Sequence, residues 1–553
     1  MRLSWLWRLS GALLYAAFVA AVVLFRSDLV PAACGAAPPR VVQARFLLVG
    51  PADDSSLAAW EASLRREGVP YLRVTPSALA RLVLADPDGT GRFLADVVAR
   101  PDLVGPAATR RLAAYERSYG LRRVLVDVTA PLPELPLGGA RLYLDGDTAQ
   151  LTAAGRAVFP YLRGPVPIDG AFGRLAPTPA GVTPLVSLGS SALVGRLTRE
   201  DGVEEVVVGV DDGPELVHSL LLAPGLIAWA ANGALTASWR PFLSVEVDPD
   251  LAGATRLEPG DLRAAATWEA ERHLTLQLGL SAGTLGGECS PLGRAVVSAG
   301  GDFRWANATF ENRPLATASA TAIADEIVRN LGWAAAHGIP LDPAQLVPPP
   351  GMLTASELPD ALARTAVKVV AGGESPPDPA SLGPATTLPR HPLTLFPDAT
   401  TRAAQIREFN RRFVTACSED CLPRPLSWSG YRRYEATRLL RLVLEGDPRP
   451  FAATLAGLAG ERLLTKVLAE TLARYRTLVR VPFASLDMTG ALAALERRLR
   501  WQQALDAGEV QAVRRGTALE LTASTAVDAP VRTAHGERWL SLAPGRTRTV
   551  RMP

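Results

Sequence analysis

The first folded region alternates continuous apolar runs with stretches whose apolar residues recur on one helical face. The runs that predict strands are residues 45–50, 71–74 and 123–128, and the stretches that predict helices are residues 57–67 and 106–119. Strand, helix and strand in this order predict a doubly wound parallel α/β domain over residues 42–130. Its loops lack a glycine-rich phosphate cradle, and Asp53 and Asp54 read as a helix cap, so no cofactor is expected there.

Between residues 131 and 239 the pattern becomes rich in short apolar runs, separated by glycine, proline and Asp-Gly turns. The runs interpreted as strands are residues 141–144, 182–188, 203–210 and 220–231. Few aromatic residues are available in this β-rich region to stack on sugars, so a scaffold role is favoured over carbohydrate binding.

The region 240–506 again alternates strand and helix patterns. Its first strand pattern ends in Glu246, Asp248 and Asp250, which alternate and therefore share one face. The helices predicted further on are residues 259–272, 321–337, 359–365, 431–475 and 489–506. The tail, residues 510–553, alternates apolar and polar positions and predicts a small β appendage of hairpins.

The first 28 residues carry a localisation signal. Arg2 and Arg8 precede a near-continuous apolar run from Leu9 to Phe25, which predicts either a signal peptide or a signal anchor. The basic flank is expected to stay cytoplasmic, so the rest of the chain would be exported and either secreted or held at the membrane by this helix. Small residues before Cys34 leave a lipoprotein signal as a minor alternative.

The amino-acid composition says little about the fold but more about which partners the chain can bind. With 48% hydrophobic and 20% charged residues, the chain has an ordinary globular composition and is long enough for several domains. A net charge of +3 gives no reason to expect nucleic acid as a partner. Nearly all the basic residues are arginine, which we attribute to a GC-rich genome rather than to an arginine-lined site.

Four cysteines suit an exported protein. Cys417 and Cys421 bracket Ser-Glu-Asp in a loop that prolines follow, and we predict a local disulfide between them. Zinc binding by this pair is less favoured because no second pair is nearby. Cys289 has no obvious partner.

Residues 305–315 hold the most specific motif. Polysaccharide deacetylases built on a (β/α) barrel carry a metal motif of the form N-H-T-F-x-H-x-x-L, in which two histidines grip one divalent ion. The stretch resembles that frame in its Asn, Thr, Phe and Leu positions, but Ala308 and Asn312 stand where the histidines belong. Alanine offers no ligand atom, and an asparagine carbonyl is a neutral donor that suits calcium better than zinc.

The order and spacing of further segments resemble one family, the exopolysaccharide deacetylases related to fungal galactosaminogalactan deacetylase, in carbohydrate esterase family eighteen. These segments are residues 111–122, 326–330 and 388–392. The resemblance implies a deacetylase-like (β/α) barrel over residues 240–506. It also implies zinc-dependent removal of N-acetyl groups from a secreted amino-sugar polymer.

Positions of this chain match roles that the resemblance implies. Asp248 matches the carboxylate base that takes a proton from water, and Arg390 matches the arginine that orients this base. The zinc-ligand positions are occupied by Pro249, Ala308 and Asn312. The residues expected to line the same mouth and bind substrate are Asn307, Trp428 and Tyr431.

Without zinc ligands the chain would lack both the activated water and the Lewis acid, and Ser429 stands where a histidine acid is expected. No cofactor is therefore expected, and the predicted function is to bind an extracellular amino-sugar polysaccharide or assist its modification. Two alternatives stay open: an active carbohydrate N-acetyl deacetylase with a non-standard site, and a cell-envelope scaffold. His337 and His391 are interpreted as structural, and the acids of the 241–250 strand as solvated rather than calcium-binding.

Overall fold

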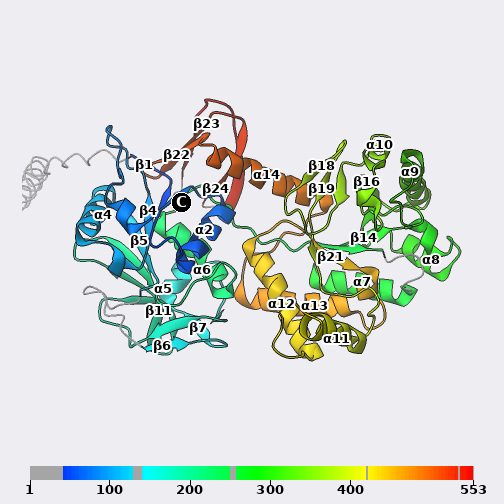
Figure 1. Cartoon of the computed structure of the whole chain (residues 1–553), viewed down its shortest axis with the longest axis horizontal. Helices are drawn as coiled ribbons and strands as arrows, with labels where there is room; N and C mark the ends of the chain where they lie inside the picture. Colours follow the sequence, from blue (N-terminus) through cyan, green and yellow to red (C-terminus); the bar gives the residue numbers. More distant parts are fainter. Residues whose placement is uncertain are drawn as a thin grey trace, which may run out of the picture.

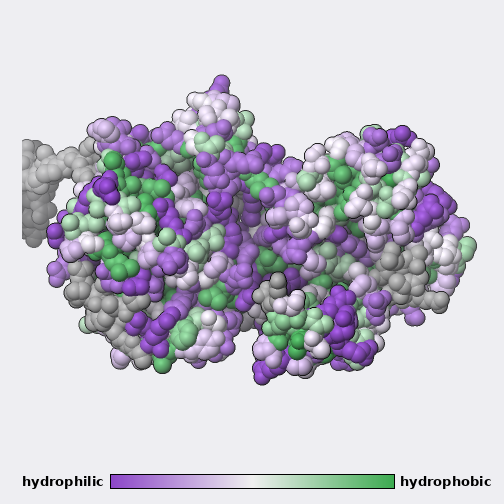
Figure 2. Space-filling model, in the orientation of Figure 1, coloured by the Kyte–Doolittle hydropathy of each residue, from purple (hydrophilic) through white to green (hydrophobic). Residues whose placement is uncertain are grey.

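The computed structural model describes residues 41–128, 140–233, 235–249, 257–418, 421–533 and 536–551. They form two lobes side by side, and the C-terminal strands return to the N-terminal lobe (Figure 1). In the space-filling view the surface mixes hydrophilic and hydrophobic residues and is hollowed where the lobes meet (Figure 2). The predicted signal segment 1–28, Cys34 and Asp250 lie outside the described residues. Within the described ranges, no helix is long and apolar enough to cross a bilayer.

The N-terminal lobe is built on one mixed sheet of nine strands. Its parallel half has the order β3 (Tyr71–Val74), β2 (Phe46–Val49), β4 (Ala95–Ala99), β5 (Arg122–Val126) and β12 (Glu204–Val208). Its antiparallel half continues with β11 (Ser191–Thr198), β10 (Thr183–Leu188), β7 (Thr148–Leu151) and β8 (Val166–Pro167). The strands predicted as a β-rich region therefore extend the sheet of the α/β domain.

Helices pack on this sheet, and their ends follow the sequence signals. They are α2 (Ser55–Glu67), α3 (Pro76–Leu79), α4 (Pro106–Tyr119), α5 (Ala153–Val158) and α6 (Val217–Ala230). A separate antiparallel sheet of two strands pairs β6 (Ala140–Tyr143) with β9 (Phe172–Leu175). The side chain of Asp54 caps α2 by accepting a 2.9 Å hydrogen bond from Leu57 N. Gly120 ends α4 in the left-handed conformation, with φ of 63°.

The apolar run 220–231 forms most of α6 and is a helix, so the predicted strand is wrong. α6 packs on strands of its own lobe and also against α2 and α12 (Trp428–Glu445). Nearly all of its residues are buried, so no polar stripe marks the helical period in the sequence. Pro224 and Gly225 within it weaken the helical signal further.

The second lobe is a curled sheet whose strand pairs are parallel, except that β18 (Ala380–Leu382) is antiparallel to β19 (Ala385–Leu388). Its other strands are β13 (Val245–Asp248), β14 (Leu276–Leu280), β15 (Arg304–Asn307), β16 (Leu341–Leu346), β17 (Val369–Ala371), β20 (His391–Pro392) and β21 (Phe451–Thr454). The segment 385–392 pairs with β17 at its start and with β21 at its end, so it draws the two edges of the sheet together. This is the deacetylase-like barrel that the sequence predicts.

The helices of the second lobe are α7 (Pro259–Arg272), α8 (Pro291–Ser298), α9 (Ala320–Ala336), α10 (Leu358–Leu362), α11 (Arg402–Asn410), α12 and α13 (Leu463–Leu478). The single helical stretch predicted at 431–475 is wrong, because β21 separates α12 from α13. Gly446 ends α12 with φ of 67°, and Pro448 and Pro450 follow at once, so the helix cannot continue.

A long helix, α14 (Met488–Asp506), links the two lobes (Figure 1). Its first turn packs in the barrel interior, where Met488 belongs to one apolar cluster with Ala308 and Leu388. Near its other end, Trp501 Nε1 donates a 2.9 Å hydrogen bond to Gly68 O of the N-terminal lobe. The helix therefore fixes the barrel to the first sheet.

The tail forms the predicted β appendage. Strands β22 (Val510–Arg515), β23 (Ala518–Ala523) and β26 (Arg548–Arg551) pair with β1 (Val41–Gln43) in one sheet, and β24 (Val527–Thr533) pairs with β25 (Gly536–Leu542). The start of the described chain and its end are therefore held in the same sheet.

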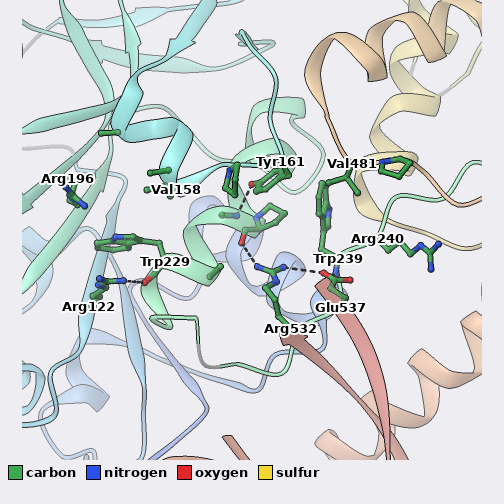
Figure 3. Close-up of a pocket in the computed structure, with 17 residues that line it drawn as sticks. Arg122, Val158, Tyr161, Arg196, Trp229, Trp239, Arg240, Val481, Arg532 and Glu537 are labelled. Carbon is green, nitrogen blue, oxygen red and sulfur yellow. Dashed lines mark hydrogen bonds and ion pairs between the residues drawn. The ribbon is translucent and has the colours of Figure 1, made fainter. Parts of the chain in front are cut away.

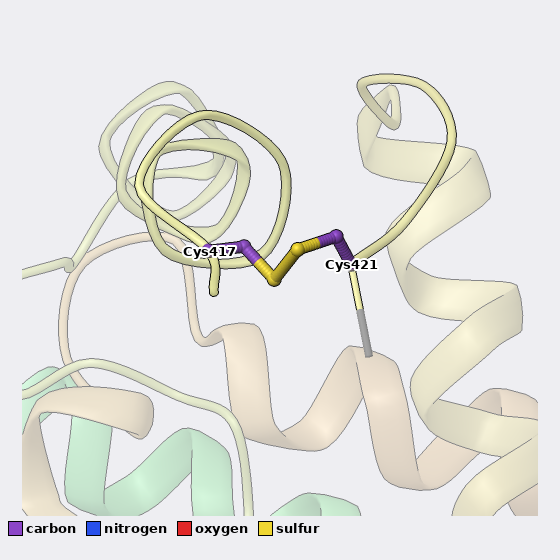
Figure 4. The surroundings of a disulfide bond; sticks show 2 residues. All are labelled: Cys417 and Cys421. Carbon is purple, nitrogen blue, oxygen red and sulfur yellow. A yellow bond between two sulfur atoms is a disulfide. The ribbon is translucent and has the colours of Figure 1, made fainter. Parts of the chain in front are cut away.

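Cys417 and Cys421 are joined by a disulfide, as predicted, while Cys289 is exposed and free (Figure 4). The bridge spans a sequence separation of only 4, so it removes little entropy from the unfolded chain. We expect Cys421→Ser to lower the free energy of unfolding by at most about 2 kcal/mol. Urea unfolding of the oxidised wild type and the variant measures this difference. A loss above about 4 kcal/mol would contradict the purely local role.

Buried Glu269 on α7 makes stability depend on pH. Its carboxylate accepts a 2.6 Å hydrogen bond from Leu276 N, and burial raises its pKa from 4.5 to about 8. Between these values the folded state keeps a proton that the unfolded chain has released, so the free energy of unfolding falls as pH rises through this window.

We expect Glu269→Gln, whose amide oxygen can accept the same hydrogen bond, to abolish this contribution. The variant should match the wild type near pH 4 and exceed its free energy of unfolding by about 2 to 4 kcal/mol near pH 9. Urea unfolding at both pH values checks the prediction. Identical pH profiles for the two proteins would refute it.

Candidate functional site

Three charged side chains meet at the carboxyl ends of the barrel strands, a surface that we call the mouth. Arg390, between β19 and β20, donates from Nη1 and Nη2 to Asp248 at 2.6 and 3.0 Å, and from Nη1 to Glu246 at 3.1 Å. Its Nε donates to Gly372 O at 2.9 Å, which fixes the plane of the guanidinium. Arg390 and Glu246 are buried, whereas 26% of the Asp248 side chain is exposed. Asp248 is therefore the member of this cluster that solvent or a ligand can reach.

Burial and charge act against each other in this cluster. Burial raises the pKa of Glu246 to about 7, although Arg390 lowers it, and the Asp248 carboxylate adds to the rise. Burial alone would lower the pKa of Arg390, but the two carboxylates outweigh it and raise that pKa above its ordinary value. Glu246 Oε1 has no hydrogen-bond partner among the described residues. The cluster thus pairs a permanent cation with a carboxyl that can hold a proton near neutral pH.

The positions that the family resemblance assigns to zinc ligands also lie together. A Cβ on Gly279 of β14 would be 2.6 Å from the Pro249 ring and 3.3 Å from the Ala308 methyl, so both groups press on the same part of β14. Asn312 Nδ2 lies 3.5 Å from Pro249 O. Pro249, Ala308 and Asn312, which the resemblance assigns to one zinc site, are therefore neighbours in space.

The side chains at these positions do not fit zinc. Zinc in proteins is held by thiolate sulfur, imidazole nitrogen or carboxylate oxygen, whereas here stand a saturated ring, a methyl group and a carboxamide. Ala308 is fully buried in the apolar cluster of the barrel interior. Over the described ranges, no three His, Cys, Asp or Glu side chains are grouped to hold a metal ion.

Asn307 is a core residue, which corrects its predicted role as a substrate ligand. It is 0% exposed, and its Nδ2 donates to Ile327 O at 3.0 Å. Its Oδ1 accepts from Thr309 N at 3.0 Å and from Asn330 Nδ2 at 2.9 Å. Asn330 in turn donates to Leu280 O at 2.7 Å. Asn307 therefore fastens the motif loop to α9 and β14 and is closed off from solvent.

Tyr431 is likewise buried, and its hydroxyl donates to Thr394 O at 2.9 Å. Its ring packs against Phe409 and Trp428, with centroids 4.9 and 5.6 Å apart. Tyr431 therefore supports the fold, which corrects its predicted role in binding substrate. Trp428 remains half-buried at the start of α12, and Ser429 Oγ lies 3.0 Å from Ser427 Oγ. The described contacts of Trp428 and Ser429 do not reach the Asp248 cluster.

The sequence prediction left two features out of the site. Glu246 shares a strand face with Asp248. Their alternate spacing was the signal from which a shared partner, here the Arg390 guanidinium, could have been expected. Phe310, in the loop after β15, is partly exposed, and the Arg329 guanidinium lies 3.8 Å from its ring centroid. Arg329 also lies 3.5 Å from Glu311. An aromatic ring on a loop at the strand ends is a typical sugar contact, but here it was read only as a part of the motif.

Comparisons with known proteins address the fold. No protein-family model matches the sequence, and no curated protein sequence matches it. The structure superposes on the crystal structure of Agd3, a carbohydrate deacetylase, with a TM-score of 0.77 and 14% sequence identity. The match covers 93% of this chain and 99% of that one. The chain therefore has the fold of a carbohydrate deacetylase along nearly its whole length, as the sequence resemblance implies.

Proposed function

We propose that this chain is an exported, non-catalytic relative of carbohydrate deacetylases that binds an amino-sugar polysaccharide at the barrel mouth. One observation carries the proposal. The Asp248–Arg390–Glu246 cluster is intact at the strand ends, while Pro249, Ala308 and Asn312 fill the neighbouring ligand positions with groups unsuited to zinc.

The cluster supplies a way to hold an amino sugar without chemistry. The exposed carboxylate of Asp248 accepts hydrogen bonds from sugar hydroxyls and attracts the ammonium group of a deacetylated residue. Arg390 donates a hydrogen bond to each oxygen of that carboxylate and so fixes its direction. Phe310 lies in a loop at the same strand ends and is partly exposed, with the Arg329 guanidinium over its ring.

Titration of the full-length chain with partly N-acetylated glucosamine and galactosamine oligomers tests the proposal. We expect saturable binding by the wild type and at least about tenfold weaker binding by Asp248→Asn, because one charged hydrogen-bond acceptor is worth about 1.5 kcal/mol or more. Asparagine can still accept a hydrogen bond from Arg390, so the thermal midpoint should change little. Asp360→Asn, an exposed aspartate on α10, is the matched control and should bind like the wild type. No binding by the wild type would leave the scaffold alternative.

A second candidate is an active carbohydrate N-acetyl deacetylase with a non-standard site. The buried Glu246 carboxyl, with its pKa raised to about 7, lies beside the exposed Asp248 carboxylate, and this arrangement offers an acid next to a base. The reaction would consume one water per amide and release acetate and an amine. Acetate release that Asp248→Asn abolishes would favour this candidate over binding alone.

A further inference from the structure

A cavity of about 830 Å³ lies between the two lobes, and none of Glu246, Asp248 and Arg390 lines it (Figure 3). Its walls come from α5 and α6 of the N-terminal lobe, from the connection that carries Trp239 and Arg240, and from Val481 and Pro482 after α13. Arg532 and Glu537 of the C-terminal hairpin complete it. A volume of this size accommodates a small organic ligand.

One wall of the cavity is a helix opened by an inserted side chain. The Tyr161 hydroxyl accepts from Gly225 N at 2.9 Å and donates to Leu221 O at 2.7 Å, so it replaces the direct hydrogen bond of that helical turn. Pro224 lacks an N–H, and its carbonyl accepts from Arg532 Nη1 at 3.1 Å. Side chains of Tyr161 and Arg532 thus engage three backbone polar groups along this wall.

The inner surface is aliphatic and aromatic. Its aliphatic part comes from α5 and α6 and includes Ala154, Ala157, Val158 and Ala228. The rings of Tyr161 and Trp239 pack together with centroids 4.8 Å apart. Trp239 Nε1 donates a 2.9 Å hydrogen bond to Leu444 O, so the indole N–H is not available to a ligand in the cavity. The alanines and Val158 of α5 and α6 offer no hydrogen-bond partner to a hydroxyl, whereas a hydrocarbon chain needs none on this wall.

The charges that line the cavity are four arginines and one glutamate. Arg122 is paired with Glu204 at 2.6 Å, and Arg532 lies 3.3 Å from Glu67. The other two are less engaged. The ion pair between Arg196 and Glu204 is long, at 4.0 Å. Arg240 has no hydrogen bond or ion pair with any residue that the structure describes. Arg196 and Arg240 flank the cavity from opposite sides (Figure 3).

We propose that this cavity binds a single-chain amphipathic anion, an alkyl chain that ends in a carboxylate or a phosphate. The chain would lie along α5 and α6 over Ala228, and the anionic head would face Arg196 or Arg240. The hydrocarbon supplies the binding free energy by leaving water, and the arginines select the sign of the head group. This site is separate from the proposed polysaccharide site and does not depend on it.

The test uses the full-length chain and tryptophan fluorescence, since Trp229 and Trp239 both line the cavity. Dodecanoate and dodecyl phosphate, both below their micelle concentrations, should each quench saturably. Dodecyl maltoside and dodecyltrimethylammonium, with the same chain, should bind at least about tenfold more weakly, and acetate and inorganic phosphate should not bind. Equal affinity for neutral, cationic and anionic detergents, or no saturable signal, would overturn the proposal. If one anion alone binds, the head group is identified.

Variants locate the site. Ala228→Trp places a large ring in the cavity and should weaken dodecanoate binding at least about tenfold. Ala335→Trp, at an exposed position of α9, should leave this binding unchanged. Replacing both Arg196 and Arg240 by glutamine should weaken it about tenfold and remove its salt dependence. Replacing Arg110 and Arg263, exposed arginines on α4 and α7, by glutamine removes the same charge elsewhere and is the control. Unchanged affinity in Ala228→Trp, with an unchanged thermal midpoint, would place the ligand elsewhere and overturn the assignment.

Discussion

A chain carrying Pro249→Asp, Ala308→His and Asn312→His is expected to retain one zinc ion after dialysis, with a Kd of about 1 μM or below, whereas the wild type retains none. The three positions lie together in space although their present side chains cannot bind zinc. Asn312 has φ of 47°, a conformation that histidine tolerates better than most residues. Removing the Pro249 ring also frees space beside Gly279.

Metal analysis of the dialysed proteins measures this gain. Pro249→Asp alone is the control and should hold no stoichiometric zinc, because one added carboxylate does not complete a ligand set. Circular dichroism confirms that each variant is folded. A folded triple variant without zinc would mean that the three positions do not converge as the structure shows. Stoichiometric zinc in the wild type would contradict the proposal that this chain is non-catalytic for want of zinc ligands.

Arg390→Ala is expected to lower the free energy of unfolding by about 3 to 5 kcal/mol. The substitution removes the cation that pairs with both carboxylates, those of buried Glu246 and partly buried Asp248. The loss should be smaller at pH 6 than at pH 9. Burial already raises the pKa of Glu246 to about 7, and without Arg390 this carboxyl keeps its proton more readily, which relieves part of the cost at low pH.

Urea unfolding at the two pH values measures this loss. Arg263→Ala, on the exposed side of α7, is the control and should change the free energy of unfolding by less than about 0.5 kcal/mol. Adding Glu246→Gln to Arg390→Ala should recover part of the loss, because it removes the uncompensated buried carboxylate. A loss below about 1 kcal/mol at both pH values would show that Arg390 does not hold the cluster together.

The family resemblance assigned Asp248 and Arg390 to one site, whereas local signals describe only the segment on which each of them lies. Asp248 ends an apolar strand, and Arg390 lies in an extended segment that proline stiffens. Their contact could not be read from spacing, since it depends on the segment 385–392 bringing the edges of the sheet together. Glu246 was visible on the same strand face, but its burial follows from closure of the barrel and not from its neighbours in sequence.

Burial also explains the errors. Asn307 ends a strand and Tyr431 lies in the first turn of a helix. Polar and aromatic side chains at such element ends often bind ligands, so both were predicted to bind substrate. Each is instead enclosed by residues far along the chain, Asn307 by Asn330 and Tyr431 by Phe409. The same cause hid α6, which is buried on all sides and therefore shows no helical period.

An assay for acetate release decides whether the mouth binds an amino-sugar polymer without hydrolysing it. The full-length wild type, as purified and again with added zinc, is incubated with N-acetylated amino-sugar oligomers at a concentration that saturates binding. We predict no acetate above that released by Asp248→Asn under either condition. Acetate release by the wild type above that level, whether or not a chelator abolishes it, would contradict binding without hydrolysis.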